Sequence, residues 1–202
     1  MKDYIKMISA LTAIAAACGL LLSVVKKGTE NRIEEQVLYN VQGPAVKDLF
    51  GYTEKIDEVM PNIMRSRQQI TVEEQARSIF VDKQDDKARA VAFECEAMGF
   101  KDKIVIIVGF DLEKDSLSGI GIISHKETPG LGARITEAVF RDIFKDKALA
   151  ETFKVKQDGG IVDAISGATI SSRAVCAAVE NGIALYPAVK EEIMKKINKN
   201  GI

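Results

Sequence analysis

The stretch KIVIIVGF, Lys103–Phe110, holds five branched aliphatic residues in succession between a lysine and a glycine. A run of this length and composition is typical of a strand that is buried on both faces. The segments ARAVAFECEA (88–97) and SLSGIGIIS (116–124) lie on either side of it, with turns at Gly99 and at 113–115 between them. Strand patterns joined by short polar turns predict a meander of antiparallel strands.

Further elements are expected around this meander. Short strands are expected at SIFV (78–81) and at GGIVDAIS (159–166). Helical patterns occupy four regions: about 30–50 with a break near Gly43–Pro44, part of the polar segment 51–77, 133–144 and 147–153. The last pattern, 171–197, predicts two helical pieces divided at Pro187, because proline removes a helical hydrogen bond. The fold class is α+β, with a small, mainly antiparallel sheet flanked by helices.

An uncharged run near the start, MISALTAIAAACGLLLSVV (Met7–Val25), has about the ~20 residues that a membrane-spanning helix requires. A cleaved signal peptide is the alternative, although the apolar run continues past any cleavage point. A lipoprotein site at Cys18 is disfavoured, because the apolar stretch should precede the cysteine. Lysines flank both ends of the run, so the charge count leaves its orientation open.

Three parts of the chain are therefore expected. Residues 1–28 form the N-terminus and a single transmembrane anchor, 29–77 a mainly helical connecting segment that packs on the domain, and 78–202 the α+β domain.

The composition excludes several classes of function. Among 202 residues there are 28 Lys+Arg and 29 Asp+Glu, so no basic surface for a nucleic acid is indicated. The three cysteines form no C-x-x-C pair and there is one histidine, which excludes a self-contained iron–sulfur or zinc site. We therefore expect no metal site, and redox chemistry would need an organic cofactor or a partner's metal. Cys95 and Cys176 can either pair in an oxidising compartment or be buried as small apolar residues.

Two loops rich in glycine or other small residues stand out. In SHKETPGLGARI (124–135), Gly130 and Gly132 let the backbone approach a flat ligand, although an ordinary strand-to-helix turn explains them as well. In DAISGATISS (163–172), small residues precede a predicted helix N-terminus, which can hold a phosphate through free N–H groups. A simple helix N-cap is the alternative explanation there.

Taken together, HKETPGLGARI and DAISGATISS resemble the FMN-binding domain family. This family is shared by the G subunit of the Rnf ferredoxin:NAD oxidoreductase complex and the C subunit of the sodium-translocating NADH:quinone reductase. The quinone-reductase C subunit is typically longer than this chain of 202 residues, so the length favours a resemblance to the Rnf G subunit. The resemblance covers the chain in outline, but the two loops carry its specificity.

The resemblance implies particular roles for the loop residues. Thr169 would carry FMN through a covalent phosphoester, and Asp163 would be part of the motif that a flavin transferase recognises when it installs FMN from FAD. The other residues expected to bind the cofactor are Glu127, Thr128, Leu131, Gly132, Ser166, Gly167 and Ala168. No catalytic residue is expected.

The resemblance also implies a function. The chain would be an electron-transfer flavoprotein subunit of a redox-driven ion translocase, with no substrate turnover of its own, in a complex that couples electron transfer between ferredoxin and NAD to Na⁺ or H⁺ transport. Its partners would be the A, B, C, D and E subunits, especially the FMN-bearing D subunit and the membrane iron–sulfur subunits. The soluble domain would lie on the extracytoplasmic side of the inner (cytoplasmic) membrane. The alternatives are the quinone-reductase C subunit and a non-redox anchored extracytoplasmic interaction protein.

Overall fold

The computed structural model describes residues 2–72, 74–84 and 87–200. The chain divides into two compact units, Met1–Asn40 and Val41–Ile202. The first unit is the helix α1 (Lys2–Val37) with the start of a π-helical turn, Leu38–Gln42. Within α1, Asp3–Glu30 is long and apolar enough to cross a membrane, judged by length and composition. This helix agrees with the expected anchor.

The second unit is built on one six-stranded antiparallel sheet in the order β1-β2-β3-β4-β5-β6. The central strand β4 (Lys103–Asp111) contains the apolar run KIVIIVGF. It pairs with β3 (Lys87–Met98) and β5 (Ser116–Ser124). The predicted meander is confirmed. The outer strands are β1 (Arg67–Val72), β2 (Gln75–Gln84) and the two-residue β6 (Lys147–Ala148).

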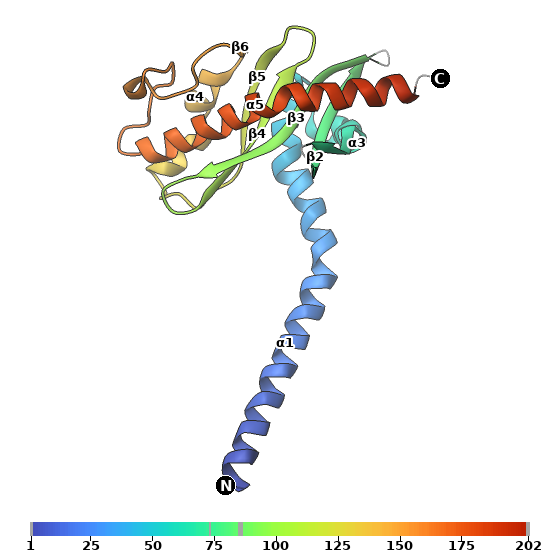
Figure 1. Ribbon diagram of the computed structural model, residues 1–202, viewed down its shortest axis with the longest axis vertical. Coiled ribbons are helices and arrows are strands. Elements are labelled where there is room, and N and C mark those ends of the chain that lie inside the picture. Colours follow the sequence, from blue (N-terminus) through green and yellow to red (C-terminus); the bar gives the residue numbers. More distant parts are fainter. Residues whose placement is uncertain (1, 73, 85–86, 201–202) are drawn as a thin grey trace. The chain divides into compact units, whose positions relative to one another are not determined.

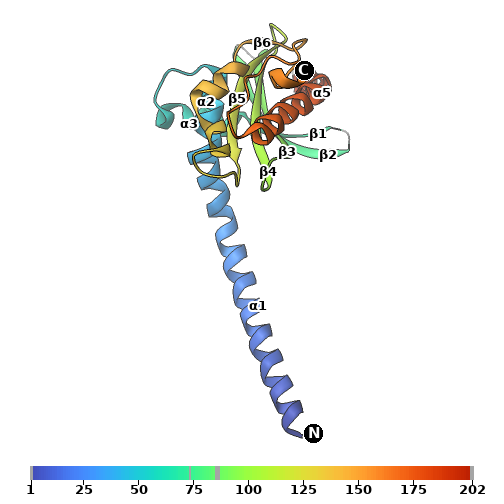
Figure 2. The ribbon, with the colours of Figure 1, turned by 90° about the vertical axis from the view of Figure 1, so that its left-hand side faces the viewer.

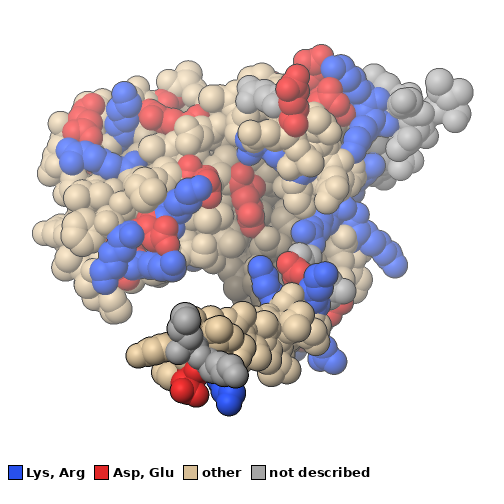
Figure 3. Space-filling view, turned by 60° about the horizontal axis from the view of Figure 1, so that its bottom comes forward, with Lys and Arg blue, Asp and Glu red and all other residues tan. Residues whose placement is uncertain are grey.

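Helices cover both faces of the sheet (Figures 1 and 2). The long helix α5 (Thr169–Asn200) crosses one face, where Phe110 stacks between Phe93 and Tyr186 at centroid distances of 5.4 and 4.5 Å. Helix α2 (Gly43–Phe50) lies against the other face, and α3 (Ile56–Ser66) packs beside it. On the molecular face of Figure 3, acidic and basic side chains are interspersed, in agreement with the balanced composition.

The prediction that Pro187 divides the last helix is wrong. Helix α5 continues through Pro187, which is exposed on its outer side. The buried side chains of Tyr186 and Val189 hold the two neighbouring turns against the sheet. This packing outweighs the roughly 3 kcal/mol that a proline costs inside a helix.

Between β5 and α5 the chain is less regular than its apolar pattern suggests. The expected helix 133–144 is a 3₁₀ turn (Gly132–Thr136), one α-helical turn α4 (Ala138–Arg141) and a second 3₁₀ turn (Asp142–Phe144). The helix expected at 147–153 is wrong, because β6 and a turn occupy this segment. The strand expected at 159–166 is reduced to one bridge between Val155 and Val162, beside the 3₁₀ turn Lys156–Asp158.

The segment 51–77 contributes a strand as well as a helix. Strand β1 alternates exposed and buried positions, with Ile70 and Val72 in the core beneath α5. Its glutamines hid this alternation in the sequence. Cys95 and Cys176 are both free and buried, which settles their interpretation as small core residues.

Gly121→Ala tests the contact between α2 and the sheet. A Cβ at position 121 would lie 2.6 Å from the Cβ of Ala45 and 3.0 Å from Ile107 Cγ2, so the helix must move away. We expect the free energy of unfolding to fall by about 1–3 kcal/mol. Urea unfolding of the full chain in detergent, followed by near-ultraviolet circular dichroism of the tyrosines, measures this loss. Gly28→Ala is the control, because nothing lies within 4 Å of Gly28; equal stability of both variants would contradict the packing.

The buried thiols should be chemically inert. Burial raises the pKa of the Cys95 thiol to about 12, and that of the Cys176 thiol to about 12. At pH 8 only about one such thiol in ten thousand is ionised, and the thiolate is the reactive form. In a Cys18→Ser background, iodoacetamide at pH 8 should modify neither thiol of the folded chain. Both should react once guanidinium unfolds the chain without reductant. Labelling of the folded chain, or protection that persists after unfolding, would contradict this assignment.

Candidate functional site

The two small-residue loops meet in one open cavity of about 320 Å³. All of the predicted site residues line it except Ser166, which is exposed beside it. The cavity is lined by Phe100, Glu127, Thr128, Leu131, Gly132, Gly167, Ala168, Thr169, Ile170 and Ser171. Segments about forty residues apart in sequence therefore form a single site.

The first loop folds back on itself directly after β5. The carbonyl of Thr128 accepts hydrogen bonds from the N–H groups of Leu131, at 3.2 Å, and Ala133, at 3.1 Å. This turn directs Leu131 toward the second loop. A Cβ added at Gly167 would lie 3.4 Å from Cδ1 of Leu131. Gly167 has φ +77°, a conformation that other residues adopt at a cost, so its identity follows from the turn before α5.

A buried carboxylate joins the loop to two other segments. Glu127 is 5% exposed, and its Oε1 accepts hydrogen bonds from the N–H groups of Phe100, at 3.0 Å, and Lys101, at 3.2 Å. Its Oε2 accepts a hydrogen bond from the hydroxyl of Ser171 in the first turn of α5. Hydrogen bonds to a charged group contribute about 1.5–3 kcal/mol each. Glu127 therefore fixes the β3–β4 turn, the first loop and α5 to one another.

Gly132 is small because of this carboxylate. A Cβ at position 132 would lie 2.7 Å from Ser171 Oγ and 2.8 Å from Glu127 Oε2. Gly99 is under the same constraint, since its Cβ would lie 2.6 Å from Glu127 Oε1. These contacts account for both glycines without any ligand.

The hydroxyl groups at the start of α5 differ in their partners. Ser171 donates to Glu127, whereas Ser172 accepts from the N–H of Ile165 and donates to the carbonyl of Ala168, both at 3.0 Å. Both serines are buried. In the part of the chain that the structure describes, no hydrogen bond is found for the hydroxyl of Thr169, which is half-buried and lines the cavity.

The main-chain groups at the start of α5 favour an anion. The first N–H groups of a helix have no intrahelical partner, and the helix dipole makes this end positive. Arg173 lies one turn further on and forms a two-pronged ion pair with Asp158, at 2.7 and 2.9 Å. The hydrogen bond from Arg173 holds the pKa of the Asp158 carboxyl below its ordinary value.

Apolar side chains form the outer walls of the cavity. Phe100 is 65% exposed, Ile170 50% and Leu131 46%, so a flat ring can lie against them. The lining residues Phe100, Ile170 and Ser171 were not predicted from the sequence. An aromatic residue directly after Gly99 in a hairpin turn, where burial is not expected, was the available signal for Phe100.

Two further residues from the motifs lie beside the cavity. His125 accepts a hydrogen bond from the N–H of Glu127 at 3.2 Å, a structural role. Asp163 is exposed and forms an ion pair with Lys156 at 2.8 Å. Its carboxylate lies on the surface ahead of the Ser166–Thr169 turn.

Comparisons with known proteins address the same region. A model of the FMN-binding domain family matches residues 99–184, which include the whole cavity. The G subunit of the ion-translocating oxidoreductase complex of Methanosarcina acetivorans is 39% identical over 49% of this chain and 53% of its own length. The corresponding protein of Pseudomonas aeruginosa PAO1 is 28% identical over 86% of this chain and 84% of its own length. Across the relatives at 34–39% identity, the chain spans 49–61% of the relative's length.

A solved structure shares the fold. The C subunit of the Na⁺-translocating NADH-quinone reductase of Parabacteroides distasonis superposes with a TM-score of 0.57 at 20% identity, over 78% of this chain and 92% of its own. Residues 99–184 are thus similar to the FMN-binding domain family, and the chain is similar over part or most of its length to G subunits of ion-translocating oxidoreductase complexes.

Proposed function

We propose that this chain is a membrane-anchored electron-transfer protein that carries FMN on Thr169 through a phosphoester. The observation that carries the proposal is the hydroxyl of Thr169. Of the three hydroxyls in the first turn of α5, this one lines the cavity and lacks a hydrogen-bond partner in the described part of the chain.

The residues of the cavity fit FMN. The N–H groups at the start of α5 provide donors for a phosphate that keeps one negative charge after esterification, and the helix dipole adds about 0.3–1 kcal/mol. The side chains of Phe100, Leu131 and Ile170 offer apolar surface to the isoalloxazine ring. When bound, the flavin supplies the capacity to accept and donate single electrons, while the protein positions it.

Attachment requires another protein. No histidine or lysine is found among the residues that line the cavity, and the Glu127 carboxylate is already used by three donors. We infer that a flavin transferase supplies the base. Thr169 Oγ1 forms a bond to the phosphorus of the FMN half of FAD, the pyrophosphate bond breaks, AMP leaves and the hydroxyl proton passes to the transferase. Asp163 is exposed and thus accessible to that enzyme.

The proposed physiological role follows from the relatives, which are named as components of an ion-translocating oxidoreductase complex. The flavin would relay electrons between neighbouring subunits in a complex that couples ferredoxin oxidation and NAD reduction to Na⁺ or H⁺ transport. The chain itself would turn over no substrate. Its apolar N-terminal helix would anchor it, with the flavin domain on the extracytoplasmic side of the cytoplasmic membrane. The FMN-bearing D subunit and the membrane iron–sulfur subunits would be its electron partners.

Thr169 variants test the attachment. We expect a chain co-expressed with a flavin transferase to give a fluorescent band on a denaturing gel under ultraviolet light. Thr169→Ala should lose the band completely, because among the hydroxyls in the first turn of α5 only that of Thr169 lines the cavity without a hydrogen-bond partner in the described residues. Thr71→Ala is the matched control and should keep it, since Thr71 is an exposed threonine on β1 outside the cavity. An unlabelled wild-type chain, or a band that persists in Thr169→Ala, would sink the proposal.

A double-mutant cycle tests the anchoring role of Glu127. In Glu127→Gln one carboxylate oxygen is replaced by an amide nitrogen, which cannot accept a hydrogen bond. The variant therefore loses the hydrogen bonds that this oxygen accepts, either from Ser171 or from the N–H groups of Phe100 and Lys101. We expect Glu127→Gln and Ser171→Ala each to lower the free energy of unfolding by about 1–3 kcal/mol. Their effects should be non-additive by about 0.5–3 kcal/mol, because they share one hydrogen bond.

The same cycle separates anchoring from attachment. Thr169 remains present in both variants, so flavin labelling should become slower but still reach Thr169. Strict additivity of the two stability losses would show that the two side chains do not act together.

A further inference from the structure

Strands β2 and β3 separate part of the way along the sheet. Their pairing ends at Ile79 with Phe93, although β2 starts at Gln75 and β3 continues to Met98. The beginning of β2 stays paired with β1, and the end of β3 stays paired with β4. The sheet therefore has an internal opening between residues 75–78 and 94–98.

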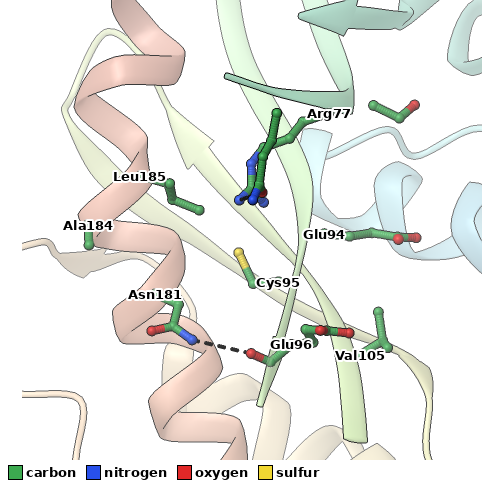
Figure 4. A pocket seen from close by; sticks show the side chains of 10 residues that line it. Arg77, Glu94, Cys95, Glu96, Val105, Asn181, Ala184 and Leu185 are labelled. Carbon is green, nitrogen blue, oxygen red and sulfur yellow. Dashed lines mark hydrogen bonds between the residues drawn. The ribbon is translucent and has the colours of Figure 1, made fainter. Parts of the chain in front are cut away.

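A cavity of about 620 Å³ lies at this opening, on the side covered by α5 (Figure 4). We call it the β2–β3 cleft. It is distinct from the flavin cavity, with which it shares no lining residue. Its lining residues are Gln75, Arg77, Ser78, Glu94, Cys95, Glu96, Val105, Asn181, Ala184 and Leu185.

Arg77 points into the β2–β3 cleft toward Cys95 (Figure 4). One terminal nitrogen donates to Gln75 Oε1 at 3.1 Å. Its Nε is buried and, in the described part of the chain, has no hydrogen-bond partner. Buried polar groups in proteins are nearly always hydrogen-bonded, so this donor indicates an acceptor outside the described residues of the chain.

The neighbouring charges do not provide this acceptor. Glu94 accepts a hydrogen bond from Gln42 at 2.6 Å, and Glu96 is paired with Lys103. Cys95 is a buried thiol that stays protonated at neutral pH, because burial raises its pKa. A guanidinium of this kind pairs best with a carboxylate or another oxyanion.

The open edge of β3 supplies main-chain groups beside Arg77. The side-chain amide of Asn181 on α5 donates to the carbonyl of Glu96 at 3.2 Å, where the main-chain N–H of a neighbouring strand would otherwise donate. In an antiparallel strand, alternate residues turn both main-chain groups to the same side. The N–H of Gly99 donates to the carbonyl of Asp102, so these residues form a hydrogen-bonded pair at the β3–β4 turn. By alternation along β3, the main-chain groups of Cys95 and Ala97 point toward β4, whereas those of Glu96 and Met98 point toward the cleft.

We propose that the β2–β3 cleft is a docking site for an extended segment of a partner protein that carries an acidic side chain. The segment pairs with the free edge of β3 at Glu96 and Met98, and its carboxylate binds Arg77. A strand fits better than a small anion, because an anion would leave the main-chain groups of β3 unpaired. The inference does not depend on the proposed flavin function.

Matched peptides on the full chain in detergent micelles test the proposal by fluorescence anisotropy. The probe is a labelled, acetylated and amidated peptide, Thr-Val-Thr-Glu-Thr-Val-Thr, compared with its glutamine counterpart. We expect the glutamate peptide to bind at least about tenfold more tightly, since its carboxylate pairs with the guanidinium of Arg77, whose Nε is buried. N-methylation of alternate amides that removes the strand hydrogen bonds should weaken binding by a similar factor.

Variants of the chain test whether the peptide binds in the β2–β3 cleft. Arg77→Gln should bind the glutamate peptide only as weakly as the wild type binds the glutamine peptide. Arg65→Gln is the matched control, an exposed arginine on α3 outside the cleft, and should bind normally. Thr169→Ala should also bind normally, so failure of the flavin proposal and of this one are distinguishable.

The outcomes are decisive even if Arg77→Gln does not fold, because the peptide comparisons use the wild-type chain. Equal binding of the glutamate and glutamine peptides would overturn the proposal. So would binding unaffected by N-methylation, full competition by acetate, or no binding at about 1 mM peptide.

Discussion

The carboxylate of Glu127 is the constraint on which the site depends. A charged group that is 5% exposed is stable only if it is well hydrogen-bonded, because burial removes its hydration. Its three donors come from the β3–β4 turn and from the first turn of α5. The loop after β5 therefore has one position relative to the N-terminus of the longest helix of the domain. The cavity proposed for the flavin is the space left between these tethered segments.

This constraint changes the meaning of the small residues in the two motifs. Gly132 and Gly99 are small so that their backbones can lie against the carboxylate, and Gly167 is glycine because of its positive φ. Ser171 and Ser172 use their hydroxyls within the protein. Thr169 is thus set apart from its neighbours by its unused hydroxyl. A motif that looks uniformly small in sequence contains residues with three separate physical roles.

The sequence predicts the elements whose patterns are decided locally. The apolar run of β4, its two neighbours and the N-terminal apolar helix all follow from periodicity and composition. The misjudged elements are those that packing decides, such as the continuation of α5 through Pro187 and the glutamine-rich strand β1. At the site, seven of the eight predicted binding residues line the cavity. The lining residues Ile170 and Ser171 were not predicted, and neither was Phe100. Its position depends on a hairpin turn held by Glu127, a contact that no local pattern contains.

The free edges of the sheet show how the domain manages unpaired strands. The outer edge of β1 is protected by Lys196, which donates to the carbonyl of Gln69 at 2.5 Å. Such a lysine discourages pairing with another chain, because an added strand would bury its charge. At the inner edge of β3, the neutral Asn181 donates to the carbonyl of Glu96, and Arg77, whose Nε is buried, lines the same cleft. A neutral amide yields its hydrogen bond to an incoming strand at little cost. Strand β3 ends at Met98, and Phe100 in the turn that follows lines the cavity proposed for the flavin. A partner strand paired with the end of β3 would therefore lie close to the proposed flavin site, because the turn that carries Phe100 directly follows this strand.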